Sequence, residues 1–226
     1  MLLTDAIVSL QLSENFQAEH VFVMHKLVRS SVMSSCFFLE GVANLCVDSL
    51  DFSKSRREEH DKMTVFSKFD FFVQAQEASK RIDYSDARVG KAMQLVRIRN
   101  DFVHPKIGVR RIGKVEGKPG VRMAAPKQYG NLSIHDEPLF WGPSFAVEAL
   151  QVVTSFLEYL FLEVARLTPE QSKLLLCHGR RTDELDKNLL ATTPVFSSEG
   201  FDDDGMKVYC AEKGISLGFL LPTDTN

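Results

Sequence analysis

Apolar residues recur every three or four positions along most of residues 1–178. This spacing lines one face of an α-helix, because a helix completes a turn in about 3.6 residues. The clearest run follows a candidate N-cap at Ser144 and contains Val147, Leu150, Val153, Leu157, Leu160 and Val164. The pattern predicts an all-α fold, built as an antiparallel bundle of about four to six helices.

Local motifs mark the starts of two further helices. Residues 55–58 (Ser-Arg-Arg-Glu) and 168–171 (Thr-Pro-Glu-Gln) have the capping-box pattern, in which the first and fourth side chains bond free amides of the first turn. Pro169 takes the first helical position, where its missing N–H group costs nothing. We therefore expect one helix over residues 55–78 and another that begins at Pro169.

A third helix carries signals at both ends. The Asp-Tyr-Ser-Asp stretch at residues 83–86 is a candidate helix start. The helix should end at about His104, because Pro105 disfavours the α conformation of the residue before it. The sequence thus predicts a helix that opens near Asp83 and stops at about His104.

Regular spacing is lost in two segments. Glycines and prolines are frequent over residues 105–143, which predicts a long connection or a short hairpin, and irregular segments of this length are usually functional or disordered. Beyond residue 178 the composition becomes acidic, and residues 207–217 have a hairpin-like pattern that could dock on the domain. The predicted organisation is one helical domain, 1–178, with the loop 105–143 inserted, and an acidic tail, 179–226.

Composition narrows the class of protein. The 226 residues carry a net charge of −3, so any binding of nucleic acid must come from local charge. The four cysteines lack metal-ligand spacing, which favours reduced, buried thiols in a cytoplasmic protein. Glutamates interrupt both of the most apolar stretches, and the first residues lack a basic leader region. We expect no membrane span, no cofactor and no metal, since the histidines also lack paired ligand spacing.

The end of the predicted helix that opens near Asp83 combines charge with two apolar faces. Val89, Met93, Val96 and Val103 share one stripe, and Asn100 lies in its middle. The opposite stripe is formed by Leu95, Ile98 and Phe102. Two apolar faces predict two partners, of which one is the core of the domain and the other is a neighbouring subunit.

Residues 99–104, Arg-Asn-x-x-x-His, resemble the R-x(4–6)-H signature of HEPN-domain proteins, and the resemblance extends over residues 30–167. It implies an all-helical bundle that forms a homodimer, in which Arg99, Asn100 and His104 of both subunits line one catalytic cleft. Many members of the family are metal-independent endoribonucleases that leave a cyclic phosphate and a 5′-hydroxyl. Lys106 stands where some toxin members have a tyrosine, which weakens an assignment to that subtype.

The residue chemistry agrees with that implication. Attack by a ribose 2′-hydroxyl needs a base, an acid and cations around the phosphate, and two copies of His104 could divide the proton transfers. Arg99 offers a planar fork of donors to a phosphate, and Asn100 could orient Arg99 or His104. Glu40 interrupts an apolar run, so it is a candidate partner for Arg97 or Arg99, or else a solvent-facing residue at a helix edge.

Local charge supports an RNA partner. Residues 97–122 contain eight Lys and Arg residues against two acidic residues, a local net charge of +6. The candidate substrate-binding residues are Arg97, Lys106, Arg110, Arg111 and Lys114. The alternative is that these charges only keep a flexible segment solvated.

The predicted function is therefore a metal-independent endoribonuclease, in toxin activity, defence or RNA processing, with an antitoxin or regulator protein as a further partner. A non-catalytic HEPN module that binds RNA, nucleotide or protein has the same fold and the same basic segment. The third hypothesis is a structural helical protein without a nucleic-acid role. Such a protein would show no salt-dependent binding of RNA, unlike the other two.

Overall fold

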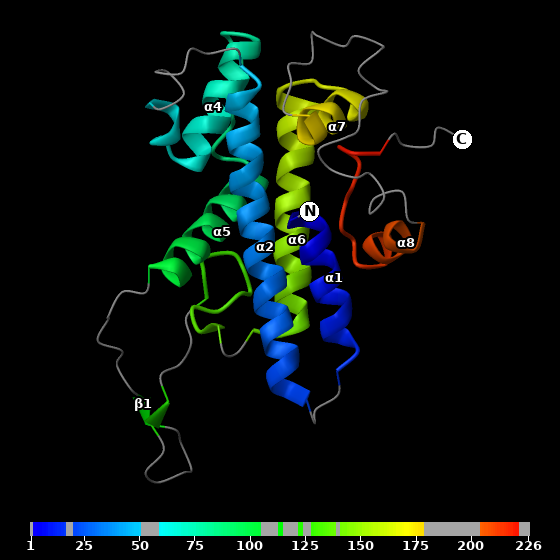
Figure 1. Cartoon of the computed structure of the whole chain (residues 1–226). Helices are drawn as coiled ribbons and strands as arrows, with labels where there is room; N and C mark the ends of the chain where they lie inside the picture. Colours follow the sequence, from blue (N-terminus) through cyan, green and yellow to red (C-terminus); the bar gives the residue numbers. More distant parts are fainter. Residues whose placement is uncertain are drawn as a thin grey trace.

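The computed structural model describes residues 2–16, 20–50, 59–104, 113–114, 122–123, 128–138, 141–178 and 204–221. Two long helices, α2 and α6, lie side by side along the centre, and the other helices pack around them (Figure 1). In chain order the elements are α1 Leu2–Glu14, α2 Val21–Asp48, α4 Val65–Gln76, α5 Ala87–Val103, β1 Gly113–Lys114, β2 Arg122–Met123, α6 Pro143–Glu158, the π-helical segment η3 Tyr159–Val164, α7 Pro169–His178 and α8 Asp204–Glu212.

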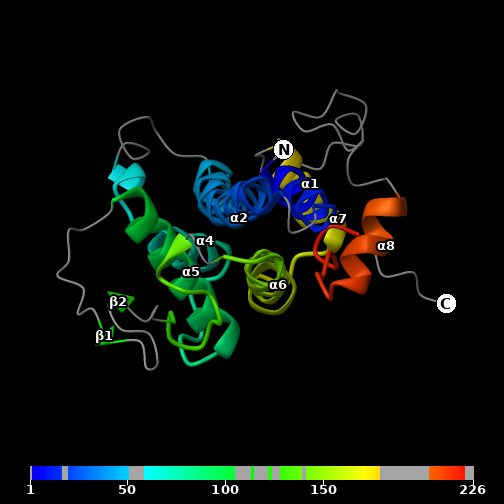
Figure 2. The ribbon, with the colours of Figure 1, turned by 90° about the horizontal axis from the view of Figure 1, so that it is seen from below.

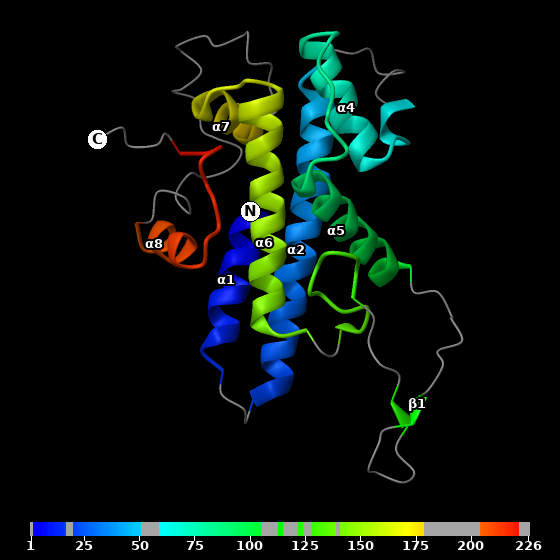
Figure 3. The same cartoon turned by 180° about the vertical axis from the view of Figure 1, so that it is seen from behind.

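The all-α prediction is confirmed, but the expected number of helices and the antiparallel arrangement need correction. The described ranges contain eight helical segments rather than four to six. α1 and α2 are antiparallel, and α5 runs against α6, whereas α2 and α6 run in the same direction (Figures 1 and 3). The cause is the chain between α2 and α6, which contains α4 and α5 and returns to the end of the bundle where α2 began.

The hydrophobic core lies between these layers. α2 contributes Val28, Val32, Leu39 and Val42, all at most 1% exposed. The phenylalanines of α4 pack edge to face on α6 and η3, with ring centroids 5.3 Å apart for Phe69–Phe156 and 6.4 Å for Phe72–Phe161. The Phe-rich face of residues 66–72 is thus core, as its helical spacing indicates.

Of the helix starts expected from capping boxes, the one at Thr168 agrees with the structure, and the helix expected from residue 55 does not. The capping box at Thr168 is present, because the Gln171 amide donates to the Thr168 hydroxyl and the Thr168 amide donates to the Gln171 side chain. Residues 55–58 lie outside the described residues. The single helix expected over residues 55–78 is wrong, since the chain turns at residues 62–63 and α4 begins anew after Thr64, whose hydroxyl accepts from the Ser67 amide.

Two other boundaries are informative. α5 begins directly after the stretch 83–86 that was expected to open it, with Asp86 as its N-cap, and it ends at Val103 as expected. α6 begins at Pro143 with Gly142 as N-cap, so Ser144 is inside the helix and the predicted cap is wrong. The expectation of a long connection or short hairpin after α5 is met in part by β1 and β2, in which Gly113 pairs with Met123 and Lys114 with Arg122.

The small hairpin predicted in the tail is wrong, because residues 204–212 form α8. Met206 and Cys210 lie one helical turn apart and are the buried residues of this helix. The segment does dock on the domain, since the Phe219 ring is fully buried and packs on Phe161 with centroids 6.3 Å apart. Figure 2 shows α8 and α5 on opposite sides of α6. The part of the acidic tail at residues 179–203 lies outside the described residues.

Polar contacts also attach α8 to the first helix. The Glu14 carboxylate accepts from the Tyr209 hydroxyl at 2.9 Å and pairs with Lys213 Nζ at 2.6 Å. The Gln151 side chain of α6 donates to the Lys213 carbonyl at 2.6 Å. The C-terminal segment is therefore a structural part of the bundle.

Two stretches, Val21–Asp48 and Pro143–Val164, are long and apolar enough to cross a bilayer. Within the bundle, 56% and 61% of their most apolar windows are buried. The core helices of a soluble bundle pass the same test of length and composition, so this finding has little weight in either direction.

Replacing Phe219 by Ala should lower the free energy of unfolding by about 3 to 5 kcal/mol, because removal of this fully buried aromatic side chain would leave a cavity beside Phe161 of η3. Val208→Ala is the matched control in the same segment, since Val208 is 57% exposed, and it should change stability by less than about 0.5 kcal/mol. Urea denaturation measures both values. Equal effects of the two variants would contradict the docking of α8 described above.

Candidate functional site

α5 divides its residues between a buried face and an exposed face. Val89, Ala92, Leu95 and Ile98 are at most 1% exposed and face α2 and α6. On the other side Met93 is 45% and Val103 is 42% exposed, and Arg97, Asn100 and His104 are also exposed. The two faces predicted from the sequence are therefore present, although Val89 belongs to the core and only part of its predicted stripe faces solvent.

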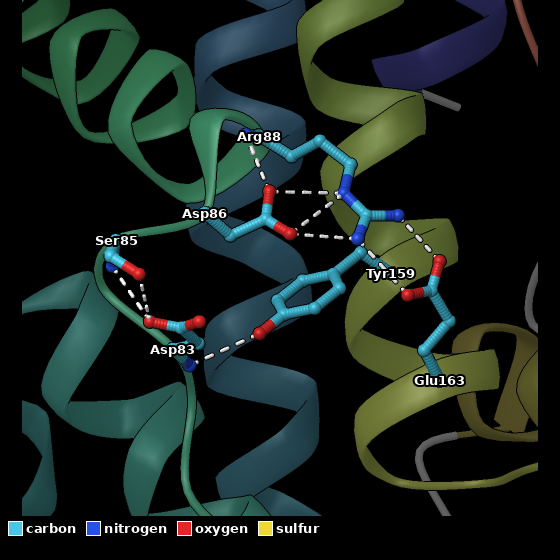
Figure 4. Close-up of polar contacts among 6 residues, drawn as sticks. All are labelled: Asp83, Ser85, Asp86, Arg88, Tyr159 and Glu163. Carbon is cyan, nitrogen blue, oxygen red and sulfur yellow. Dashed lines mark hydrogen bonds and ion pairs between the residues drawn. The ribbon is translucent and has the colours of Figure 1, made fainter.

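The N-terminal end of α5 is held by Arg88, whose guanidinium contacts both the N-cap Asp86 of α5 and Glu163 of η3. Asp86 caps the helix by accepting from the Arg88 amide at 2.7 Å, and its carboxylate also accepts from Arg88 Nε at 3.0 Å and Nη2 at 2.7 Å (Figure 4). The same guanidinium pairs with Glu163 of η3 and lies 4.3 Å above the Tyr159 ring. The Tyr159 hydroxyl accepts from the Asp83 amide at 3.0 Å.

This network, defined as Asp83, Asp86, Arg88, Tyr159 and Glu163, joins the start of α5 to the end of α6. The π-helical geometry of η3 belongs to the same junction, because Ala165 N–H reaches back five residues to the Leu160 carbonyl at 2.8 Å. The Arg88 guanidinium holds the pKa of the Asp86 carboxyl below its ordinary value of 3.8. The sequence indicates Asp83 and Asp86 as part of a helix start. No sequence pattern indicates that Arg88, Tyr159 and Glu163 join them.

At the C-terminal end, the chain that returns from the basic segment is fixed on α5. The Tyr129 hydroxyl donates to the Asp101 carboxylate at 3.0 Å, and the Asn131 amide donates to the Gln94 side chain at 3.0 Å. Gly130 has a φ of +55°, and an added Cβ would lie 2.5 Å from Gln94 Nε2, so only glycine fits this turn without displacement. Figure 3 shows this segment between α5 and the lower half of the bundle.

Trp141 connects the chain at residues 128–138 to α2 by hydrogen bonds. Its indole N–H donates to the His135 carbonyl at 2.8 Å, and its own carbonyl is 2.8 Å from Nδ1 of His25 on α2. The Phe102 ring, 40% exposed, stacks on the buried Trp141 ring with centroids 6.0 Å apart. Both ends of α5 are thus held against the bundle, and the basic segment leaves and returns beside its last turn.

Arg99 is the most strongly engaged of the predicted site residues. Its Nη2 pairs with the Glu40 carboxylate of α2, and its Nη1 donates to the Asn100 side-chain oxygen at 2.9 Å. The guanidinium also lies 5.5 Å from the centre of the Phe37 ring. The predicted pairing of Glu40 with Arg99 is confirmed, and the Glu40 side chain is half-buried at 34% exposure, so it also keeps part of its surface in solvent.

His104 is the C-cap residue of α5. Its amide donates to the Asn100 carbonyl at 2.9 Å, and its side chain is exposed. Arg99, Asn100 and Glu40 are therefore brought together, while His104 is held through the backbone at the end of the same helix. Arg97, two positions before Arg99 on the same helix, is exposed.

The other predicted substrate-binding residues are not described at the level of side chains. Lys106, Arg110 and Arg111 lie outside the described residues, and Lys114 is placed by its backbone alone, in β1. Their contribution to a site therefore stays a prediction.

Two residues near Arg99 were missed in the sequence. Phe37 precedes Glu40 by three positions on α2, which is the spacing of neighbours on one helix face, so this signal was available. Cys36 lies 3.6 Å from the Leu95 carbonyl of α5. Burial raises the pKa of the Cys36 thiol to about 12, against a smaller opposing effect of Arg99, so this cysteine is not a thiolate nucleophile at neutral pH.

Comparisons of the chain with protein-family models, with curated proteins and with solved structures gave no match. Within the described ranges, no group of three or more His, Cys, Asp or Glu residues could hold a metal ion.

Asp86→Asn tests the charged contact at the start of α5. Asn is as good an N-cap as Asp, so the substitution removes the charge while it retains the cap. At neutral pH we expect the parent to be more stable by about 1 kcal/mol. Because the pKa of folded Asp86 is depressed, this advantage should be present above pH 3.8 and be lost as the pH falls through the lower folded value.

Unfolding free energies of the two proteins between pH 7 and pH 2 measure this difference. A difference that stays constant over the whole range would mean that the Asp86 charge contributes nothing through Arg88. Asp5→Asn on α1, an exposed acidic position, is the control for general effects of net charge.

Proposed function

We propose that this protein is a metal-independent endoribonuclease of the HEPN type, with Arg99, Asn100 and His104 at its active site. The observation that carries the proposal is the arrangement at the end of α5. A guanidinium already oriented by two neighbours lies five positions before an exposed histidine, and the chain leaves for the basic residues 106–122 and returns at Tyr129 beside the last turn of α5.

Each residue has a role in cleavage by a 2′-hydroxyl. Arg99 binds the scissile phosphate and stabilises the charge that builds up in the transition state. His104 transfers protons, and its exposed position at the helix end leaves it open to the solvent and to RNA. Asn100 orients Arg99, to which it is already bonded.

A homodimer completes the site in this proposal. One imidazole cannot readily act as base and acid in the same step, whereas two copies of His104 across a two-fold axis can. The half-exposed Met93 and Val103 on the face of Asn100 supply apolar surface for such an interface. The partners are then RNA, a second copy of the chain and, in a toxin or defence setting, an antitoxin or regulator protein.

A non-catalytic HEPN module that binds RNA is the second candidate. The pairing of Arg99 with Glu40 favours it, because a guanidinium whose charge is compensated inside its own protomer binds a phosphate less strongly. The two candidates differ in whether RNA is cut.

The decisive experiment incubates the protein with labelled single-stranded RNA in excess EDTA. We expect cleavage that leaves cyclic-phosphate and 5′-hydroxyl ends, and a loss of at least about 100-fold in rate for Arg99→Ala and His104→Ala. Matched controls are Arg81→Ala and His20→Ala, at exposed positions outside α5, which should cut like the parent.

Binding of RNA without cleavage by the parent would establish the non-catalytic module instead. Equal activity of the parent and both site variants would show that the nuclease, if present, uses other residues. Sizing chromatography of every variant verifies that the proteins compared are folded and have the same oligomeric state.

The basic segment should determine how steeply binding depends on salt. Replacing Lys106, Arg110, Arg111 and Lys114 by Gln should reduce the slope of log affinity against log salt by about 3, because each lost phosphate contact on a single strand removes about 0.7. The control replaces four exposed cations elsewhere, Lys26, Lys62, Arg81 and Arg166. A similar change in both proteins would mean that net charge, and not this segment, controls binding.

A further inference from the structure

The guanidinium of Arg99 is held on several sides within its own protomer. Nη2 pairs with the Glu40 carboxylate, Nη1 donates to Asn100, and the Phe37 ring lies 5.5 Å away. Nε is buried and has no hydrogen-bond partner. Such a group is immobilised before any ligand arrives.

The donor inventory shows what is left for a ligand. A guanidinium has five N–H groups, of which one is on Nε and two are on each terminal nitrogen. The buried Nε cannot reach a ligand in solvent, and Glu40 and Asn100 each take one terminal N–H. One N–H remains on Nη1 and one on Nη2, which together match two oxygens of a phosphate.

Glu40 sets this orientation from a different helix. It lies on α2 between core residues, because Leu39, Val42 and Ala43 are at most 1% exposed. Asn100 is adjacent to Arg99 on α5, so it cannot fix the guanidinium relative to the rest of the bundle. The contact with Glu40 is therefore what ties the position of Arg99 to the central helix.

The charge of the Glu40 carboxylate weakens the binding of RNA to Arg99. A phosphate on the two remaining N–H groups would lie within a few ångströms of the Glu40 charge, and like charges at this distance repel. A carboxylate at this place improves the geometry of Arg99 and weakens its hold on an anion.

We propose that Glu40 is a positioning residue for RNA cleavage, which orients Arg99 toward the scissile phosphate while its charge lowers the affinity for RNA. The inference rests on the proposed function and assigns to Glu40 a role through Arg99, not a contact with the substrate. Orientation then depends on the acceptor oxygen of residue 40, whereas affinity depends on its charge.

Two substitutions separate these effects. Glu40→Gln keeps an acceptor oxygen at the same reach and removes the charge, and Glu40→Ala removes both. For Glu40→Gln we expect RNA to bind about 3-fold or more tightly, with kcat within about 3-fold of the parent. For Glu40→Ala we expect kcat to fall by about 10-fold or more, because a misplaced group is costly for an oriented reaction.

The experiment measures kcat on cleavable RNA in EDTA, and affinity on an RNA with 2′-O-methyl groups that cannot be cut. Glu14→Gln is the matched control, since Glu14 forms a comparable half-buried ion pair with Lys213 on the other side of the bundle. It should change neither quantity.

Three outcomes overturn the inference. Equal kcat and affinity for the parent and both variants would show that Glu40 only stabilises the fold. A collapse of kcat in both variants would assign Glu40 to proton transfer instead of positioning. If the parent cuts no RNA, the proposed nuclease fails first, and unchanged affinity of Glu40→Gln for the 2′-O-methyl RNA then rejects the electrostatic effect as well.

Discussion

The packing of α2 on α6 is the contact on which the rest of the structure depends. α2 and the continuous stretch of α6 and η3 are both long and apolar, and removing their side chains from water is the main favourable contribution to the folding of such a bundle. Since both run in the same direction, the chain between them must cross from one end of the bundle to the other. α5 makes this return, and its last turn with Arg99 and His104 therefore lies near the start of α6.

α5 lies firmly against this core because it is fastened at both ends by side chains of other elements. The Arg88 network ties its first turn to η3, and the Tyr129–Asp101 bond ties its last turn to the chain that enters α6. Between them, Leu95 and Ile98 anchor the helix by burial. The candidate site at its end is thus built on a rigid element, while the face that bears Asn100 is exposed to solvent.

The features that could be predicted from sequence are those encoded within a few residues. The helix start at residues 83–86 and the capping box at Thr168 are predictable because each is a local exchange of hydrogen bonds. The break before α4 was missed, although Thr64 and Ser67 carry its signal. The sequence favours a hairpin at residues 207–217 because Val208 and Tyr209 are typical of strands, whereas the buried Met206 and Cys210 follow the helical spacing that α8 shows.

For the candidate site too, the local motif could be predicted from sequence, whereas the long-range contacts around it could not. Arg99, Asn100 and His104 share one short motif, and the charge of Glu40 in an apolar run indicated its partner. The contact of Arg88 with Glu163 joins residues 75 positions apart and depends on the π-helical register of η3. No local pattern contains that information, since it arises only when α5 and α6 are packed together.

The attachment of α8 to α1 determines when during synthesis the bundle can close. Glu14 and Lys213 are 199 positions apart, so the ion pair between them forms after almost all of the described chain has left the ribosome. At about 5–20 residues per second, Glu14 at the end of α1 waits roughly 10–40 s for its contacts with Tyr209 and Lys213. The end of α1 therefore stays without this attachment until the synthesis of the described chain is nearly finished.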